Sequence, residues 1–419
     1  MTDATYAPPG DVDGTLVADR LHWVLSVLAG RGPGLGTEPA RHFVPAFLER
    51  HADVGALFDA WRALGPFTVE STTPLAHKAW ATLVGAGGAR YSLAMTIDTS
   101  GLLRRVEIDP EVFRRIPRAL SEVDDVLTRD DVTSTALVCR RVGEHWEVLY
   151  ERSPGALMPT GSVFKVFVLL AVARAVRDGD ARWDDEIVLG PRARSLPTGE
   201  MQDLPDGTRT SLYQAAHNMF ARSDNTASDL VIGHIGRDAV HRAVAAAGHH
   251  RPDALRPFPT SRELFEIGWG RQELLTEWQD GDEAARERLL DRIDGPLTTR
   301  IPDLTYPAYQ RGLDWFASAW DVCHALSALW QAAQADRTGR IRDILAVYSG
   351  VEMDRDRWPI TLFKGGSTPG VVMFCWLLLD RHDVEHAVVL MQSADRVGVL
   401  KDGLPLRRLG DLIIHGLIR

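Results

Sequence analysis

Apolar and polar residues follow a helical period and then a strand period in the first quarter of the chain. Residues 16–30 and 41–64 place apolar side chains at helical spacing, and Gly and Pro close both segments, which predicts two amphipathic helices. Residues 67–72, 91–98 and 102–109 then alternate with a period of two, and turn signals separate them. Helices followed by a small antiparallel sheet predict a compact α+β domain over residues 12–110.

The remainder of the chain begins and ends with strand patterns. Residues 112–129 predict a helix, and two strands follow that turn at Gly143. After a long helical middle, three further strands and an apolar-striped helix close the chain. The predicted strands span residues 133–141, 146–152, 360–367, 370–380 and 386–393, and the last helix spans residues 409–418. We expect a second domain over residues 112–419, with one antiparallel sheet that the C-terminus completes, flanked by helices and joined to a helical subdomain.

Size and charge agree with two soluble domains and narrow the range of partners. With 419 residues, of which 45% are hydrophobic, the chain can bury two cores. The 47 basic residues are outnumbered by 57 acidic ones and form no block, so neither nucleic acid nor an anionic membrane is an expected partner. The first twenty residues carry four aspartates where an export signal would carry lysine or arginine, which predicts a cytoplasmic location. The oligomeric state stays open.

No cofactor or metal is expected. The three cysteines lie in apolar runs typical of buried thiols, and the longest apolar segment, residues 163–176, is interrupted by charges and is not a membrane span. Histidines gather between residues 217 and 250 without metal-ligand spacing, and the glycine-rich residues 30–36 lack the strand and lysine of a phosphate loop.

The strongest candidate chemistry is the sequence Ser162-Val163-Phe164-Lys165, which opens a helix that is apolar on nearly every side. Residues three apart share a helix face, so the Lys165 amine can lie beside the Ser162 hydroxyl. Burial lowers the pKa of an amine, and a neutral amine can accept the serine proton. The N–H groups at the helix start are suited to an oxyanion.

Two further elements follow in order. Ser223-Asp224-Asn225 ends an amphipathic helix, where a hydroxyl and an amide can project toward the nucleophile. Lys364-Gly365-Gly366-Ser367 ends an apolar strand, where glycines let a substrate lie along the backbone and the Ser367 N–H can complete an oxyanion hole.

These three elements in this order resemble S-x-x-K, S-D-N and K-T-G of the class A β-lactamase and penicillin-binding-protein superfamily. The resemblance covers about residues 112–419 and implies a serine hydrolase with that fold. It implies an acylated nucleophile at Ser162, activated by Lys165, and a proton relay at Ser223. It also implies that Asn225 holds the substrate amide, that Lys364, Gly366 and Ser367 bind the substrate carboxylate and oxyanion, and that Asp224 is structural.

Two departures from the family pattern concern turnover. KGGS replaces K-T-G, and residues 226–363 contain no E-x-x-L-N sequence for the glutamate that drives deacylation. Glu263 is the nearest candidate, but it equally fits a carboxylate that caps a helix. Efficient β-lactam hydrolysis is therefore not expected, and both roles of Glu263 stay open.

Lysine is rare enough to be informative. The only lysines are Lys78, Lys165, Lys364 and Lys401, so 47 − 4 leaves 43 arginines. A position that keeps lysine against this bias can require a compact amine that loses its proton. We hypothesise that Lys78 of the first domain reaches the active-site cleft; an ordinary surface lysine is an equally good interpretation.

The N-terminal domain resembles, in pattern alone, the steroid-isomerase and polyketide-cyclase-like roll. The two-domain arrangement is similar to the β-lactamase-like proteins of clavulanic acid gene clusters. This resemblance implies a β-lactam or small-ester substrate, weak β-lactamase activity and a role in β-lactam biosynthesis. The alternatives are a general esterase, a D,D-peptidase relative, or a sensor or carrier that binds a β-lactam without turnover.

Overall fold

The computed structural model describes residues 14–31, 38–51, 53–75, 78–98, 100–111, 117, 119–294, 296–351, 353, 355–400 and 403–418. These residues form two compact units. One contains the described residues of Pro117–Ser349 and Asp354–Arg419, and the other those of Pro9–Ile116 with Gly350–Met353. No helix formed by the described residues is long and apolar enough to cross a bilayer.

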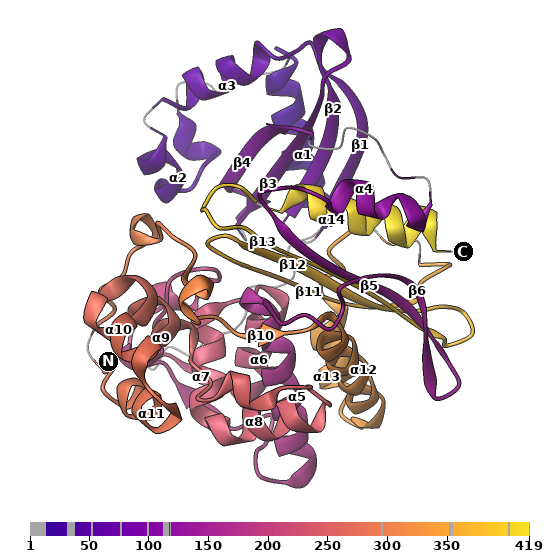
Figure 1. The fold of residues 1–419 in the computed structure, drawn as a ribbon. Coiled ribbons are helices and arrows are strands. Elements are labelled where there is room, and N and C mark those ends of the chain that lie inside the picture. The colour runs from indigo at the N-terminus through magenta and orange to yellow at the C-terminus, as the bar shows by residue number, and fades with distance from the viewer. Residues whose placement is uncertain are drawn as a thin grey trace. The chain divides into compact units, whose positions relative to one another are not determined.

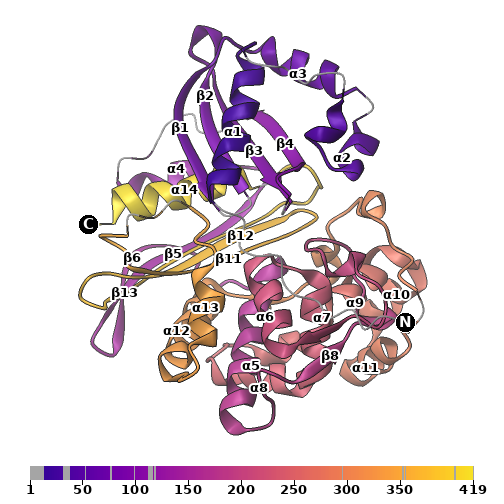
Figure 2. The ribbon, with the colours of Figure 1, turned by 180° about the vertical axis from the view of Figure 1, so that it is seen from behind.

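The N-terminal unit is a four-stranded antiparallel meander with a helix against it (Figures 1 and 2). Its strands pair in the order β1-β2-β3-β4, and α1 packs against β1 and β2. Every second residue of β2 and β3 contributes to one apolar core, namely Ala79, Ala81 and Leu83 of β2 and Leu93, Met95 and Ile97 of β3. The elements are α1 (Gly14–Leu28), η1 (Pro39–Arg41), α2 (Pro45–Arg50), α3 (Val54–Arg62), β1 (Thr68–Leu75), β2 (Lys78–Val84), η2 (Ala86–Gly88), β3 (Arg90–Ile97) and β4 (Leu103–Pro110). The likeness to a steroid-isomerase roll stays a prediction.

Two details of the predicted secondary structure are wrong, and a third is confirmed in part. The single helix over residues 41–64 is broken into η1, α2 and α3, because Pro45 starts one helix and the Asp53 carboxylate caps the next through Ala56 N at 2.8 Å. Strand β2 was missed because two of its buried positions, Ala79 and Ala81, are too small to give a strong alternation signal. Of the helix predicted over residues 112–129, the structure describes only η3 (Leu120–Glu122) and α4 (Val123–Leu127), and residues 112–116 lie outside the described part.

The five-stranded sheet of the larger unit confirms the expectation that the C-terminus completes it. Strands pair antiparallel in the order β11-β12-β13-β5-β6, so the two strands at the start of this unit join the three near its end. Their bounds are β5 (Thr133–Val142), β6 (His145–Arg152), β11 (Ile360–Thr368), β12 (Val371–Leu379) and β13 (Glu385–Ser393).

Helices cover both faces of this sheet (Figures 1 and 2). On one face, Gly410 of α14 (Leu404–Leu412) lies directly against the Trp376 ring of β12. On the other, Cys323 of α12 (Ala319–Ala335) lies 3.7 Å from Cys139 of β5, sulfur to sulfur. Neighbouring residues of a strand point to opposite faces, and both faces of this sheet are covered, so every residue of β12 except the half-buried Phe374 is buried. Its sequence is therefore a continuous apolar run.

The remaining helices form the helical part that carries the predicted nucleophile. The longest buried one is α5 (Lys165–Asp178), which packs against α6, α7, α8 and α12. The other helices here are α6 (Leu212–Ala221), α7 (Asn225–Ile235), α8 (Arg237–Ala246), α9 (Ser261–Phe265), α10 (Gln272–Asp280), α11 (Glu283–Asp291) and α13 (Arg340–Ala346), and η11 (Ile413–Leu417) extends α14. Two short strand pairs connect segments of this part, β7 (Met158–Pro159) with β10 (Phe316–Ala317) and β8 (Glu186–Val188) with β9 (Arg209–Ser211).

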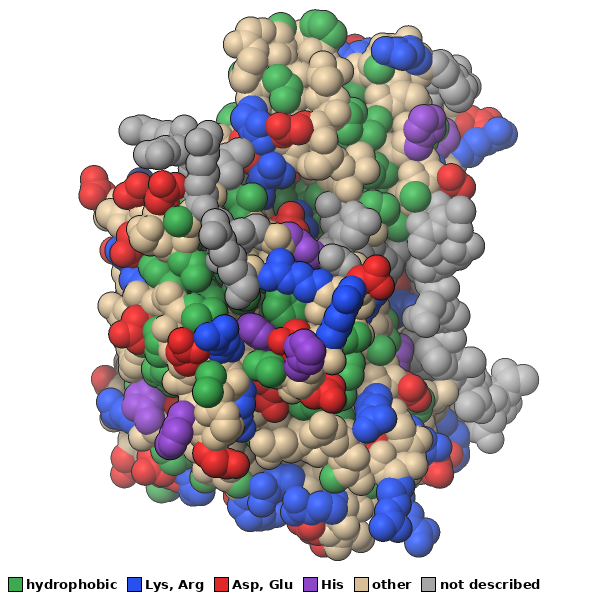
Figure 3. Space-filling model, turned by 90° about the vertical axis from the view of Figure 1, so that its right-hand side faces the viewer, with side chains coloured by type: hydrophobic (Ala, Val, Ile, Leu, Met, Phe, Trp, Pro, Cys, Tyr) green, Lys and Arg blue, Asp and Glu red, His purple; other side chains and the backbone are tan. Residues whose placement is uncertain are grey.

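On the face of the molecule shown in Figure 3, acidic and basic side chains are interspersed.

Candidate active site

Ser162 lies in η4 (Gly161–Phe164), the single turn that leads directly into α5. Its side chain is partly exposed, whereas Val163, Phe164 and nearly all of α5 are buried. The first N–H groups of a helix have no partner within the helix, so the Ser162 N–H is placed to receive an acceptor from outside. The apolar surroundings therefore hold the nucleophile rigidly and leave its hydroxyl accessible.

Lys165 contacts the Ser162 hydroxyl as the helical spacing predicts. Lys165 Nζ lies 3.2 Å from Ser162 Oγ, and 2.7 Å from both the Ser223 carbonyl oxygen and Asn225 Oδ1. A neutral amine has two N–H groups and one lone pair. The two short contacts can take both N–H groups, which leaves the lone pair to accept the Ser162 proton.

The environment of Lys165 favours this neutral form. The amine is completely buried, and burial lowers the Lys165 pKa from 10.5 to about 7. The carboxylates of Asp224 and Asp229 oppose this shift by favouring the charged form. Near pH 7, a large fraction of the molecules therefore has an amine that can act as a base.

Ser223 lies between the two predicted active-site lysines. Its hydroxyl is 2.9 Å from Lys364 Nζ and 3.4 Å from Lys165 Nζ. Its backbone has a φ of +58°, a left-handed conformation that costs a residue other than glycine about 1–3 kcal/mol. Two backbone bonds from the next residues hold this turn, Asp224 N to Asn218 O and Asn225 N to Thr198 O.

The structural role expected for Asp224 agrees with its contacts. Its buried carboxylate caps α7 through Ala227 N at 2.8 Å and accepts hydrogen bonds from Glu200 N and Met201 N at 2.8 and 3.0 Å. Gly199 is required beside it, because a Cβ there would lie 2.1 Å from the carboxylate. Asp224 thereby joins the loop before Met201 to the turn that presents Ser223.

Asn225 positions Lys165 within the protein. Its side-chain oxygen accepts from Lys165, and its Nδ2 donates to the Leu196 carbonyl at 2.9 Å. The residue is 7% exposed. Its contact with a substrate amide stays a prediction. Its hydrogen bond to Lys165 gives it a positioning role that the motif did not indicate.

The KGGS element lies against the start of η4. Lys364 is buried and donates to the Gly365 carbonyl at 2.7 Å as well as to Ser223. A Cβ on Gly366 would lie 2.2 Å from Thr160 O and 2.9 Å from Ser162 N. On the facing segment, a Cβ on Gly161 would lie 2.8 Å from Ser367 N. The two glycines therefore allow a backbone approach that brings the Ser162 and Ser367 N–H groups into one region, while the Ser367 side chain is exposed.

Asp314 is a buried residue near the nucleophile that the sequence analysis missed. It accepts hydrogen bonds from Gly161 N at 3.0 Å and from Thr368 Oγ1 at 2.8 Å, on either side of the Ser162 and Ser367 pair. Burial raises its pKa to about 6, and these hydrogen bonds lower it. Asp314 belongs to no recognised motif, and only the fold brings it to this position.

Glu263 has the contacts of a helix cap. With Thr260 it forms a capping box, in which Thr260 N donates to Glu263 Oε2 at 2.7 Å and Glu263 N donates to Thr260 Oγ1 at 3.2 Å. Its other carboxylate oxygen pairs with Arg237. Within the described part of the chain, Lys165 is the only side chain that hydrogen-bonds the Ser162 hydroxyl.

Lys78 begins β2, where its backbone pairs with Leu75 of β1 and Thr96 of β3. Its side chain lies outside the described residues, as does Lys401. The hypothesis that Lys78 reaches the active site therefore stays a prediction.

One group of residues in the described part could hold a metal ion by distance alone, namely His249, His250 and Asp321. Asp321 already forms the capping box of α12 with Ser318, and it accepts from His250 Nδ1 at 2.7 Å. His249 Nε2 contacts the Phe316 carbonyl oxygen at 3.0 Å. These hydrogen bonds account for the cluster without a metal.

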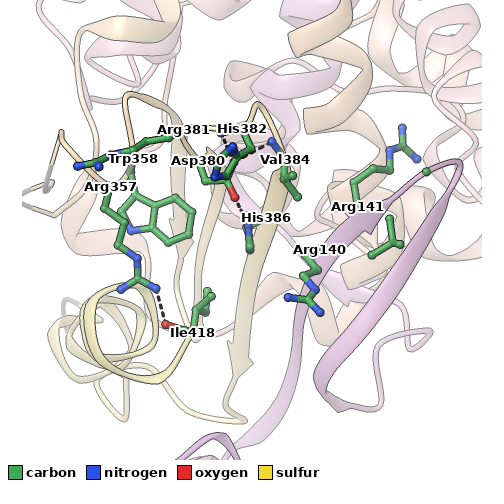
Figure 4. A pocket seen from close by; sticks show the side chains of 12 residues that line it. Arg140, Arg141, Arg357, Trp358, Asp380, Arg381, His382, Val384, His386 and Ile418 are labelled. Atoms are coloured by element: carbon green, nitrogen blue, oxygen red, sulfur yellow. Dashed lines mark hydrogen bonds and ion pairs between the residues drawn. The ribbon is translucent and has the colours of Figure 1, made fainter.

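A cavity of about 690 Å³ lies at the other end of the same sheet (Figure 4). It is lined by the end of β5, the turn between β12 and β13, and Arg357, Trp358 and Ile418, and it includes none of the predicted site residues. Arg357 donates to the Ile418 carbonyl, Asp380 contacts His386, and Arg140 pairs with Glu147 outside the lining. The cavity is therefore separate from the Ser162 site.

Two protein-family models match the chain. Residues 121–348 match the family described as "Beta-lactamase enzyme family", and residues 12–103 match the family described as "ORF 12 gene product N-terminal". No curated protein matches the chain.

Solved structures that are similar to this chain include two β-lactamases and one further protein. A β-lactamase from Sphaerobacter thermophilus is 18% identical, with a TM-score of 0.47 over 70% of this chain and 94% of its own. A β-lactamase from Burkholderia vietnamiensis is 12% identical, with a TM-score of 0.48 over 72% and 97%. A protein named PBP-A is 13% identical, with a TM-score of 0.47 over 72% and 98%.

Proposed function

Because the chain belongs to the beta-lactamase enzyme family, with residues 121–348 matching that family's model, we propose that it forms an acyl-enzyme at Ser162 with a β-lactam or a small ester. The observation that carries this proposal is the position of Lys165 Nζ. The amine lies 3.2 Å from Ser162 Oγ, and its two closer contacts are both acceptors.

In the first step, Ser162 Oγ forms a bond to the substrate carbonyl carbon while its proton passes to Lys165 Nζ. The carbonyl π electrons move to oxygen, and the N–H groups of Ser162 and Ser367 stabilise the resulting charge. A preorganised donor of this kind is worth roughly a hundred- to a thousand-fold in rate.

In the second step, the tetrahedral intermediate collapses and the bond to the leaving group breaks. For a β-lactam this is the C–N bond, and the ring nitrogen takes a proton from Ser223, which Lys165 or Lys364 can replenish across 3.4 or 2.9 Å. For an ester the C–O bond breaks, and the leaving alkoxide takes the proton. The Lys364 ammonium attracts the substrate carboxylate in either case.

Deacylation is the slow step of this proposal. It requires a base for water, and the carboxylate suggested by position, Glu263, is committed to Thr260 and Arg237. This contact pattern favours weak β-lactamase activity and keeps a sensor or carrier of β-lactams as a second candidate. An esterase is favoured where the acyl group is small, because water then reaches the acyl-enzyme more easily.

A role in clavulanate-type β-lactam biosynthesis is the finer part of the proposal. It rests on the resemblance of the two-domain arrangement and on the expected cytoplasmic location. Deletion of the gene in a producing strain, followed by analysis of accumulated β-lactams, tests it separately from the chemistry.

The chemistry is tested by the intact mass of the full chain after mixing with clavulanate, benzylpenicillin or a cephalosporin that carries an acetyl ester. Wild type is compared with Ser162→Ala. A mass gain that only wild type shows supports an acyl-enzyme, and loss of the acetyl group with an intact lactam ring supports the esterase. A product burst without steady turnover favours the sensor or carrier. Folded wild type that gives neither adduct nor product contradicts acylation of Ser162 by these substrates.

A further inference from the structure

Asp314 connects three segments around the predicted oxyanion site. It lies just before β10, and its Oδ1 accepts from Thr160 N at 3.2 Å, Gly161 N at 3.0 Å and Trp315 N at 2.8 Å. Its Oδ2 accepts from Thr368 Oγ1 at 2.8 Å. Gly161 immediately precedes Ser162, and Thr368 immediately follows Ser367, so one carboxylate holds the neighbours of both N–H groups.

The connection through Asp314 matters because the backbones of η4 and β11 approach each other closely. The Cβ positions of Gly161 and Gly366 would overlap the facing segment, so at these two positions η4 and β11 approach each other without a side chain between them. Thr160 N and Oγ1 also bond the Trp315 carbonyl, at 2.8 and 2.9 Å. Those bonds join η4 to the segment around β10, and among the described residues the Thr368 hydroxyl is the group of β11 that hydrogen-bonds Asp314.

We propose that Asp314 is a positioning residue that sets the spacing between the Ser162 and Ser367 N–H groups. The inference rests on the proposed function, since these groups are the donors that stabilise the oxyanion there. Asp314 acts through the two backbones and contacts neither the nucleophile hydroxyl nor the substrate. Asp314 is 6% exposed and forms no ion pair with the described residues, so its hydrogen bonds carry the effect.

The groups that donate to the Asp314 carboxylate allow a conservative variant of this residue. In Asp314→Asn, the amide oxygen can still accept from the three backbone N–H groups, and the amide nitrogen can donate to the Thr368 hydroxyl. Asp314→Ala removes the acceptor of Gly161 N, Trp315 N and the Thr368 hydroxyl, whereas Thr160 N keeps its bond to the Trp315 carbonyl. Thr368→Val removes only the bridge to β11 at nearly constant volume.

Thr361→Val is a matched control. Thr361 is a second threonine of β11, buried where Thr368 is half-buried, and its hydroxyl has no hydrogen-bond partner among the described residues. It lies at the opposite end of the strand from Thr368. It therefore reports the effect of replacing a hydroxyl in this strand without touching Asp314.

The test measures acylation of the full chain by a chromogenic cephalosporin, separating the rate constant at saturation from the constant for non-covalent binding. We expect Thr368→Val to lower the acylation rate constant about ten- to a hundred-fold with little change in binding, because small misplacements near the reacting atoms are costly. Asp314→Asn and Thr361→Val should stay near wild type, and Asp314→Ala should lose at least as much as Thr368→Val. Equal rate constants for Thr368→Val and Thr361→Val would overturn the proposal.

Crystal structures of wild type and Thr368→Val test the same inference without any reaction. The distance between Ser162 N and Ser367 N should widen in the variant, and an unchanged distance would contradict the proposal. If wild type is not acylated at all, the proposed function fails, while this distance still decides the positioning role of Asp314.

Discussion

The most informative perturbation of this site is a change of pH, because burial moves the Lys165 pKa to about 7. At pH 7 about half of the molecules then have a neutral amine, compared with roughly one in three thousand for an exposed lysine. Below pH 7, the neutral fraction falls about ten-fold per pH unit, and above pH 8 it is nearly constant. Acylation of Ser162 should follow this curve.

The assay is the second-order acylation rate constant of the free enzyme, measured between pH 5 and 9 with a chromogenic cephalosporin. We expect a rise through an apparent pKa near 7 and then a plateau. Asp229 and Asp314 also titrate near this range, with pKa values raised by burial to about 7 and about 6, so the wild-type profile alone does not identify the group.

The variant Lys165→Met separates these groups, because it keeps the volume of the side chain and removes the amine. We expect the acylation rate constant to fall about a hundred- to ten-thousand-fold, which is the usual contribution of a general base. The remaining rate constant should no longer rise with pH near pH 7. A residual rate that still rises through pH 7 would refute the assignment of the base to Lys165.

The pKa of Lys165 also makes the stability of the protein depend on pH. Between about pH 7 and pH 10.5 the unfolded chain binds more protons at this lysine than the folded chain does. The contribution of Lys165 to the unfolding free energy therefore rises with pH.

Two further predictions concern the surroundings of Ser162. Gly366→Ala should reduce acylation at least about a hundred-fold, because its Cβ would lie 2.2 Å from Thr160 O, whereas Gly365→Ala should have a much smaller effect, because its closest contact is the Phe374 ring at 3.1 Å. Equal losses in the two variants, measured by intact mass against time, would contradict the close approach of β11 to η4. Glu263→Ala should lower the unfolding free energy by about 1–3 kcal/mol through loss of the cap and of the Arg237 pair, with deacylation unchanged. Slower deacylation at unchanged stability, from denaturation and burst kinetics, would instead identify Glu263 as the base.

The larger unit shows how much of the fold local patterns contain. The alternation in β5 and β6, the apolar runs of β11, β12 and β13, and the stripe of α14 all predicted the elements that form. Each signal lies within about ten residues, where the backbone period decides which side chains share a face. The N-terminal unit was predicted less well, because Ala79 and Ala81 of β2 are small and because Pro45 and Asp53 start new helices inside one helical pattern.

The sequence by itself determined that Ser162 and Lys165 share a helix face, because their spacing of three residues and the helical period are both local. Only the tertiary structure decided that Asn225 and the Ser223 carbonyl take the N–H groups of Lys165, and that Ser223 lies beside Lys364, 141 residues away in the chain. The same is true of Asp314, which is 153 residues from Gly161, and of Glu263, which pairs with Arg237. The reason is physical: burial, and therefore the pKa of Lys165, together with contacts between distant segments, arises only when the whole core packs.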